Sequence, residues 1–345
     1  MVSNSKASAG GGASNGNRAL TQPDGSNGST AISDRYADEA ARIIAAVLEE
    51  NDAYEKMEYL CDEIGHRLSG SVGLERAVAW TQEAMKADGQ ENVHGEKVMV
   101  PKWVRGEESA RLVEPREMKL HILGLGLSVG TPVEGITAPI VCVKDEGEFE
   151  AAADRMAGKI VLFNNPMPPY DPEKGAGYGT TVRFRGKGPR IAAENGAVAC
   201  LVRSVTAHSL RTPHTGATNY RDAEEKIPAA AISTEEADMI QRLSDRGREV
   251  VVTLKMDARH EGMVPSANVV GELRGSERPE EVVVIGGHLD SWDVGQGAHD
   301  DGGGCMIAME AIHVLRKLDL RPRRTIRVVL WTNAWRMESG WETWG

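Results

Sequence analysis

The sequence predicts an α/β fold, and three observations support that prediction. The segments "EVVVIGG" and "TIRVVLWTN" are runs rich in β-branched residues, which are typical of buried strands. The segment 302–318 between them carries apolar residues at helical spacing in two stripes. A strand, a two-sided helix and a second strand indicate a βαβ unit in a sheet covered on both faces.

The composition is that of a globular protein with a sizeable core. The chain has 345 residues, of which 41% are hydrophobic, enough for two or three domains. Its 40 basic and 51 acidic residues give a net charge of −11, and the sequence contains no dense run of basic residues. We therefore expect no nucleic-acid partner. No segment reaches the roughly 18 uninterrupted apolar residues of a membrane span, so we expect no membrane partner.

The first part of the chain predicts a leader followed by helices. Residues 1–33 are small and polar and are expected to be disordered. Apolar residues at helical spacing then predict three helices before any strong strand signal, and we assign 34–130 to the N-terminal helical part of the main domain. The leader lacks the apolar core of a secretory signal, which predicts a cytoplasmic chain as written.

The segment 131–256 predicts a separate β-rich insert with two helices. Short strands such as "KIVLFNN", "AVACLVRS" and "EVVVTLKM" are separated by loops rich in proline and glycine. One helix is expected over "GPRIAAENG", and another after Ser233, which is a suitable N-cap with Glu236 three residues later. The main domain resumes over 257–333, where "SANVVGELRG" is a further strand.

A histidine and several aspartates gather where the first strand of the βαβ unit ends. His288 and Asp290 are two residues apart and therefore point the same way on an extended segment. A histidine that binds a metal usually donates its second N–H to a carboxylate, so one of the two can ligate while the other orients it. Asp300 and Asp301 follow at the start of the helix, where two adjacent carboxylates repel and a divalent cation resolves the repulsion.

Other interpretations of this segment fit less well. A dinucleotide loop at "GQGAHD" would need a third glycine where Asp300 stands, and that carboxylate would repel a pyrophosphate. A calcium loop beginning at Asp290 would need oxygen ligands at Trp292 and Val294. A solvated acidic loop without function would not account for the coincidence of strand, histidine, glycines and helix. The remaining histidines are not spaced as metal ligands are, and we do not assign His299, beside Asp300, to the site.

Several segments resemble one family. "GGHLDSWDVGQGAHDDGGG" is similar to the metal-site signature of the dizinc metallopeptidases of the aminopeptidase Y class, and "RLSGSVGLERAVAW", "GAVACLVRSVT" and "LRPRRTIRVVLWTN" resemble the same family. The resemblance covers about 34–333. It implies a phosphorylase/hydrolase-like zinc exopeptidase domain interrupted by a protease-associated domain at 131–256. It also implies two zinc ions per site, a homodimer, and hydrolysis of dipeptides or short peptides as a carboxypeptidase or dipeptidase, with an aminopeptidase as the alternative.

The resemblance assigns roles to individual residues and exposes a departure from the pattern. It implies that His288 and Asp300 bind zinc, with Asp300 bridging, and that Asp290 orients His288. The general base and a further ligand would be glutamates at the positions that Ala334 and Trp335 occupy, and other ligands would lie beyond the printed sequence. We therefore expect weak or absent zinc and an inactive homologue, with 334–345 an aberrant tail from a frameshift, a wrong exon junction or a truncated gene model. The family implies a secreted or lysosomal protein, so the location stays open.

Overall fold

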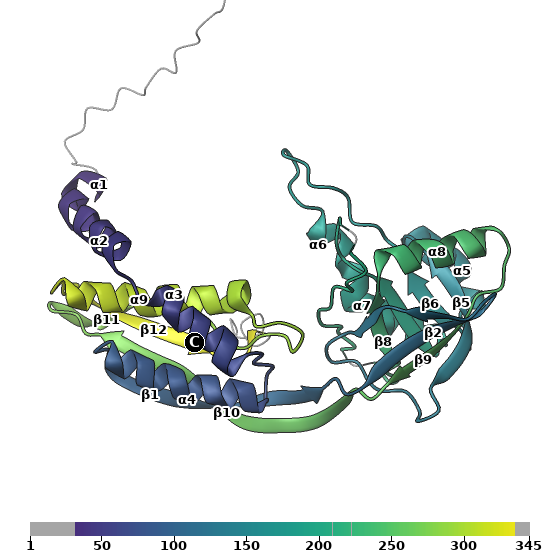
Figure 1. Ribbon diagram of the computed structural model, residues 1–345, viewed down its shortest axis with the longest axis horizontal. Coiled ribbons are helices and arrows are strands. Elements are labelled where there is room, and N and C mark those ends of the chain that lie inside the picture. Colours follow the sequence, from purple (N-terminus) through teal and green to yellow (C-terminus); the bar gives the residue numbers. More distant parts are fainter. Residues whose placement is uncertain (1–31, 209, 222, 335–345) are drawn as a thin grey trace, which may run out of the picture. The chain divides into compact units, whose positions relative to one another are not determined.

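The structure is a computed structural model that describes residues 32–208, 210–221 and 223–334 (Figure 1). Most of the expected leader and of the expected tail, Trp335 included, lies outside these residues. The chain divides into two units, Met1–Glu49 and Glu50–Gly345. The first contains the short helix α1 (Ile32–Arg35) and the helix α2 (Ala37–Glu49), which confirms the first predicted helix. No helix in the described ranges is long and apolar enough to cross a membrane.

A four-stranded sheet in the second unit carries the acidic segment. Strands β11 (Arg278–His288) and β12 (Arg324–Trp331) are parallel neighbours, and the helix α9 (Gly303–Lys317) connects them. This arrangement confirms the predicted βαβ unit and the α/β class. Strands β1 (Glu91–Val104) and β10 (Arg259–Leu273) extend the sheet by antiparallel pairing, in the order β1-β10-β12-β11.

The helix α9 and the helix α4 (Val72–Ala87) pack on one face of this sheet. Buried Val269 and Leu330 lie on that face and share a core with apolar residues of both helices. On the other face of the edge strand β11, Val282 and Val284 are 40% and 52% exposed. Cover on both faces was predicted, but the described helices cover one. A run of β-branched residues places apolar side chains on both faces whether or not each face is covered.

Two helical segments flank the loop 65–71, which lies beside the ends of β11 and β12. The helix α3 (Ala53–Glu58) continues into a π-helical turn, η1 (Tyr59–Ile64), and the segment stops at Gly65, whose φ is +79°. Helix α4 begins at Ser71, whose hydroxyl accepts a hydrogen bond of 3.2 Å from the backbone N–H of Leu74. These elements confirm the second and third predicted helices. The loop between them carries the "RLSGS" motif.

The insert is built on an eight-stranded sheet in the order β3-β2-β9-β5-β6-β7-β8-β4. Four parallel strands form its centre, of which β6, β7 and β8 are fully or largely buried, which explains their continuous apolar sequence, while β5 is only partly buried. They are β5 (Ile136–Val143), β6 (Ile160–Phe163), β7 (Ala199–Arg203) and β8 (Ala229–Ile232). The outer strands, all antiparallel, are β2 (Glu108–Glu114), β3 (Met118–Leu120), β4 (Ile122–Gly124) and β9 (Val251–Met256).

The helices of the insert confirm the two that the sequence predicts. Helix α7 (Arg183–Glu194) covers "GPRIAAENG", and helix α8 (Thr234–Asp245) begins after Ser233, whose hydroxyl accepts a bond of 3.2 Å from the backbone N–H of Glu236. Shorter helical segments complete the insert. They are α5 (Glu146–Ala152), η2 (Ala153–Arg155) and α6 (Tyr178–Thr181).

Strands β1 to β4 were not predicted, because the sequence analysis found no strong strand signal before residue 131. Strand β1 pairs with β10 but is only partly buried, and its charged residues and Pro101 break the alternation of apolar side chains. Strands β3 and β4 have three residues each, too few to show any period. Strands β2 to β4 also join the sheet of the insert, although they precede residue 131.

Candidate functional site

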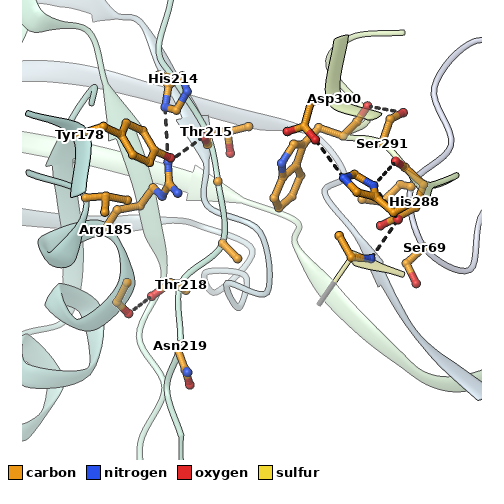
Figure 2. A pocket seen from close by; sticks show the side chains of 18 of the residues that line it. Ser69, Tyr178, Arg185, His214, Thr215, Thr218, Asn219, His288, Ser291 and Asp300 are labelled. Carbon is orange, nitrogen blue, oxygen red and sulfur yellow. Dashed lines mark hydrogen bonds and ion pairs between the residues drawn. The ribbon is translucent and has the colours of Figure 1, made fainter. Parts of the chain in front are cut away.

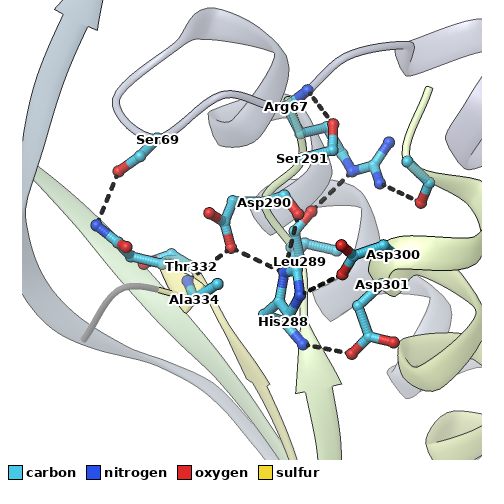
Figure 3. A network of polar contacts seen from close by, with 12 residues as sticks. Arg67, Ser69, His288, Leu289, Asp290, Ser291, Asp300, Asp301, Thr332 and Ala334 are labelled. Carbon is cyan, nitrogen blue, oxygen red and sulfur yellow. Dashed lines mark hydrogen bonds and ion pairs between the residues drawn. The ribbon is translucent and has the colours of Figure 1, made fainter. Parts of the chain in front are cut away.

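The acidic segment lies at the carboxyl end of the parallel strand pair (Figure 3). His288 is the last residue of β11, in register with Trp331 at the end of β12. Asp300 and Asp301 lie in the turn η3 (Ala298–Gly302), which leads directly into α9. The βαβ connection therefore returns the aspartates to the histidine, at the edge of the sheet where such folds bind ligands.

His288 contacts two of the predicted site residues, one with each ring nitrogen. Its Nε2 lies 2.9 Å from Oδ1 of Asp300, and its Nδ1 lies 3.2 Å from Oδ1 of Asp290. The Asp290 side chain is buried, whereas that of Asp300 is 80% exposed. The structure thus brings together His288, Asp290 and Asp300, and Asp290 is placed to fix the orientation of the imidazole.

The carboxylates set the protonation of His288. Burial alone would lower the pKa of the imidazole, but the hydrogen bond to Asp290 and the charges of Asp290, Asp300 and Asp301 outweigh burial. Together they raise the pKa of His288 to about 9. Such an environment favours a positive charge on or beside the imidazole.

Asp301 binds backbone N–H groups, whereas Asp300 contacts the His288 side chain. Its Oδ2 accepts a hydrogen bond of 3.0 Å from the backbone N–H of His288, and its Oδ1 accepts one of 3.2 Å from the N–H of Gly304. Asp301 therefore ties the end of β11 to the first turn of α9. Gly287 and Gly304 leave room for this carboxylate, because a Cβ on either residue would lie within 2.6 Å of it.

This difference predicts unequal effects on stability. Replacing Asp301 with alanine leaves two backbone N–H groups without their acceptor and should lower the free energy of unfolding by about 2 kcal/mol. Replacing the exposed Asp300 with alanine should lower it by less than about 1 kcal/mol. Urea denaturation of the two variants would measure both values. Equal losses would show that Asp301 does not anchor the strand end.

The donor chemistry of the pair His288 and Asp300 fits a zinc ion. Two donors bound to a tetrahedral ion at about 2.0–2.1 Å lie about 3.3 Å apart. The nitrogen and oxygen here are 2.9 Å apart, so a small movement admits an ion between them. Across residues 32–334, apart from 209 and 222, no group of three or more histidine, cysteine, aspartate or glutamate side chains is arranged to hold a metal ion together, because Asp290 faces the Nδ1 side of His288, away from the pair. The described residues therefore supply one imidazole and one carboxylate.

A cleft of about 680 Å³ opens beside this pair (Figure 2). Ala334, which follows β12, lines the cleft, and its backbone N–H donates a bond of 3.0 Å to Oδ1 of Asp290. Asn333 donates a side-chain bond of 3.2 Å to Ser69 of the "RLSGS" motif. The end of β12 is therefore held at the site, and the position where the family resemblance places a general base carries a methyl group.

The insert supplies the opposite wall of the cleft, which the sequence analysis did not predict. Figure 2 shows Arg185, His214 and Tyr178 across the cleft from His288. Arg185 Nη1 lies 3.4 Å from Nδ1 of His214 and donates a bond of 3.3 Å to the carbonyl of Thr215. Its guanidinium also lies 5.6 Å from the ring centre of Tyr178.

Arg185 has no anionic partner among the residues that the structure describes. Its buried Nε has no hydrogen-bond acceptor, and no carboxylate of the described residues pairs with it. Burial and the charge of Arg185 lower the pKa of His214, which favours the neutral form of this imidazole. Gly216 makes room for the guanidinium, because a Cβ there would lie 2.2 Å from Cζ of Arg185. The cleft thus carries a positive charge on one wall and the acidic pair on the other.

Comparison with known proteins agrees with this architecture. The family model described as "Peptidase family M28" matches residues 268–333, and the model for the PA domain matches residues 136–240. Carboxypeptidase Q from Bos taurus is 47% identical over 300 residues, which are 86% of this chain and 62% of that protein. The chain thus spans less than two thirds of the length of this curated relative.

Solved structures show the same fold. A peptidase M28 precursor from Shewanella amazonensis SB2B is 36% identical, with a TM-score of 0.82, over 87% of this chain and 68% of that one. A zinc aminopeptidase from Bacillus subtilis is 20% identical, with a TM-score of 0.55, over 81% of this chain and 60% of that one, which shows a shared fold. With its PA domain inserted before the βαβ unit, the chain belongs to peptidase family M28 and is a relative of carboxypeptidase Q.

Proposed function

We propose that the protein is a zinc-dependent exopeptidase that removes residues from the carboxyl end of dipeptides or short peptides. One observation supports this proposal above the others: the cleft has the pair His288 and Asp300 on one wall and the unpaired Arg185 on the other. The names of relatives, carboxypeptidase Q and a zinc aminopeptidase, agree with zinc and with a peptide substrate. Two zinc ions per site, with Asp300 bridging, are part of the proposal.

His288 and Asp300 would hold zinc, and Asp290 would keep His288 in position. Because Asp290 faces Nδ1, the Nε2 atom is directed toward Asp300 and is available for a metal. When bound, zinc polarises a peptide carbonyl and makes a water molecule a better nucleophile at neutral pH. Asp301 accepts a hydrogen bond from the backbone N–H of His288, which would help to keep His288 and Asp300 at a fixed spacing when zinc binds.

Arg185 would bind the terminal carboxylate of the peptide. A guanidinium presents several N–H groups in a fixed plane and matches a carboxylate with two hydrogen bonds. The buried Nε without an acceptor indicates that one such bond is missing in the ligand-free protein. The lowered pKa of His214 beside Arg185 disfavours a second positive charge that would compete for the substrate carboxylate. A peptide fixed at its carboxyl end by Arg185 would extend toward His288 and Asp300.

The test compares a dipeptide with the same dipeptide carrying a C-terminal amide. We expect the zinc-supplemented protein to bind the free acid more tightly, and Arg185→Met to weaken binding of the acid by about 10- to 100-fold, the value of a lost charged hydrogen bond. The affinity for the amide should change little. Isothermal titration calorimetry would measure all four affinities.

Arg190→Met is the matched control, because Arg190 lies on the same helix and pairs with Glu194 outside the cleft. This variant should bind both peptides like the parent protein. Equal binding of acid and amide by the parent would contradict recognition of a carboxylate and would favour the aminopeptidase alternative.

A second candidate is a homologue that binds peptides without cleaving them. Ala334 is the observation that favours it, because the family resemblance places the general base at this position and alanine cannot accept a proton. Peptide binding through Arg185 together with absence of turnover would be the result expected of such a protein.

A further inference from the structure

Arg67, in the loop between η1 and α4, is a fully buried cation next to the proposed zinc site. Its side chain is 0% exposed, although arginine is rarely buried without a partner. No carboxylate of the described residues forms an ion pair with it. Instead, its N–H groups donate to backbone carbonyls of the segment between β11 and η3 (Figure 3).

The guanidinium joins the two ends of that segment. Nε donates a bond of 2.7 Å to the carbonyl of Leu289, directly after His288. Nη1 and Nη2 donate bonds of 2.6 and 3.1 Å to the carbonyls of Gln296 and Gly297, shortly before Asp300. A planar fork of donors can span these three acceptors at once, whereas the single ammonium of lysine cannot.

The backbone of Arg67 strengthens the same connection. Its N–H donates a bond of 2.9 Å to the hydroxyl of Ser291, and its carbonyl accepts one of 3.1 Å from the N–H of Ser291. Gly297 has a φ of +62°, and a Cβ on it would lie 2.3 Å from Ser291 and 2.9 Å from Nη2 of Arg67. The segment 289–297 is therefore fitted closely around the arginine.

The position of Arg67 also matters for charge. Asp290, Asp300 and Asp301 place several negative charges at one strand end, and Asp290 interacts favourably with the charge of Arg67. A buried cation beneath such a group reduces the repulsion between the carboxylates before a metal is bound. Arg67 therefore acts on both the spacing and the charge of the ligand pair.

We propose that Arg67 is a positioning residue that sets the metal affinity of the site by holding the segments carrying His288 and Asp300 at a fixed separation. This inference rests on the proposed zinc site. Arg67 does not line the cleft, and its side-chain N–H groups are bound to backbone carbonyls, so we assign it no direct contact with substrate or metal. Its effect should therefore appear in metal binding, whether or not a peptide is present.

The experiment measures zinc affinity by competition with a chromogenic chelator, together with the visible spectrum of the cobalt(II)-substituted protein. We expect Arg67→Met to lower zinc affinity by about 10- to 100-fold, the range typical of residues that orient metal ligands. Arg67→Lys should restore part of the loss, because it keeps the charge but loses the fork. The cobalt spectrum of both variants should change, since it reports the arrangement of the ligands.

Arg203→Met is the control for a purely structural effect. Arg203 is a largely buried arginine of the insert that contacts Asn164 and Asp238, away from the acidic segment. Its loss should lower the melting temperature without changing zinc affinity or the cobalt spectrum. If Arg67→Met does not fold, Arg67→Lys provides the comparison.

Two results would overturn the inference, and they are distinguishable. Zinc affinity within about twofold of the parent in Arg67→Met or Arg67→Lys, with His288→Ala strongly impaired, would leave the zinc site intact and exclude the role of Arg67. Unchanged affinity in His288→Ala would show that the proposed zinc site itself is wrong, and the inference about Arg67 would fail with it.

Discussion

Replacing His288 with alanine is expected to abolish measurable zinc binding. His288 supplies the one imidazole nitrogen that faces Asp300, and the described residues bring no third donor to this pair. The loss of a partner outside the coordination shell already costs about 10- to 100-fold in metal affinity, so the loss of a ligand should exceed about 100-fold. Asp300→Ala should have a similar effect. Competition with a chelator and metal analysis after dialysis would measure it.

His214→Ala is the matched control for this prediction. His214 lines the same cleft and is also partly buried, but it lies on the wall of the insert beside Arg185. Its removal should leave zinc affinity within about twofold of the parent, well short of the loss of a partner that orients a ligand. A large loss in His214→Ala, or zinc binding that survives both His288→Ala and Asp300→Ala, would place the metal elsewhere.

The sequence predicts those parts of the fold in which the local sequence pattern matches the burial or capping that the structure shows. Strands β6 and β7 are apolar because both neighbours in the sheet and a core cover them, and β12 buries Val328 and Leu330 on the face that packs against α4 and α9. The start of helix α8 is predictable from its N-cap residue Ser233, whose hydroxyl accepts a hydrogen bond from the backbone N–H of Glu236. In such segments, a single stretch of sequence contains the information that fixes the structure.

The parts that were missed depend on distant pairing. Strand β1 is held by its long antiparallel register with β10, and residues as polar as Glu96 and Lys97 belong to it. Their strand conformation follows from backbone hydrogen bonds to another part of the chain, which no local apolar pattern reveals. The same holds for strands β2 to β4, which are short or lie at the margin of the eight-stranded sheet.

The candidate site divides in the same way. His288, Asp290 and Asp300 were predicted because they lie within one strand-turn-helix segment, and the structure brings them together. The role of Arg185 was not predictable, since nothing in its local sequence separates it from Arg183 or Arg190 on the same helix. What distinguishes Arg185 is the cleft, formed by parts of the chain that are far apart in sequence.

Arg67 shows how a weak signal can be overlooked. It stands directly after the helical stop at Gly65 and opens the motif "RLSGS", which was quoted only for its resemblance to the family. An arginine in a loop is ordinarily read as a surface residue. Its burial follows from the carbonyls of Leu289, Gln296 and Gly297, which the sequence cannot place around it.

The largest effect on activity is expected at Ala334. This residue lines the cleft, and its backbone N–H is fixed to Asp290, which also contacts His288. A glutamate introduced here would place a carboxylate in the cleft next to the proposed zinc ligands. Such a group can accept a proton from the attacking water and later deliver it to the leaving amine, a contribution of about 10²- to 10⁴-fold in rate.

We therefore expect Ala334→Glu to hydrolyse a dipeptide with zinc present at least about 100-fold faster than the parent protein, with the increase removed by a chelator. Ala334→Gln is the matched control, because glutamine has nearly the same size and can form similar contacts but cannot take up the proton. Initial rates of amine release as a function of pH would separate the two variants: the rate of Ala334→Glu should fall as pH drops through the pKa of the new carboxylate, and that of Ala334→Gln should not. Equal rates for the two variants would mean that position 334 does not present a base to the scissile bond, since proton transfer is the one property in which they differ.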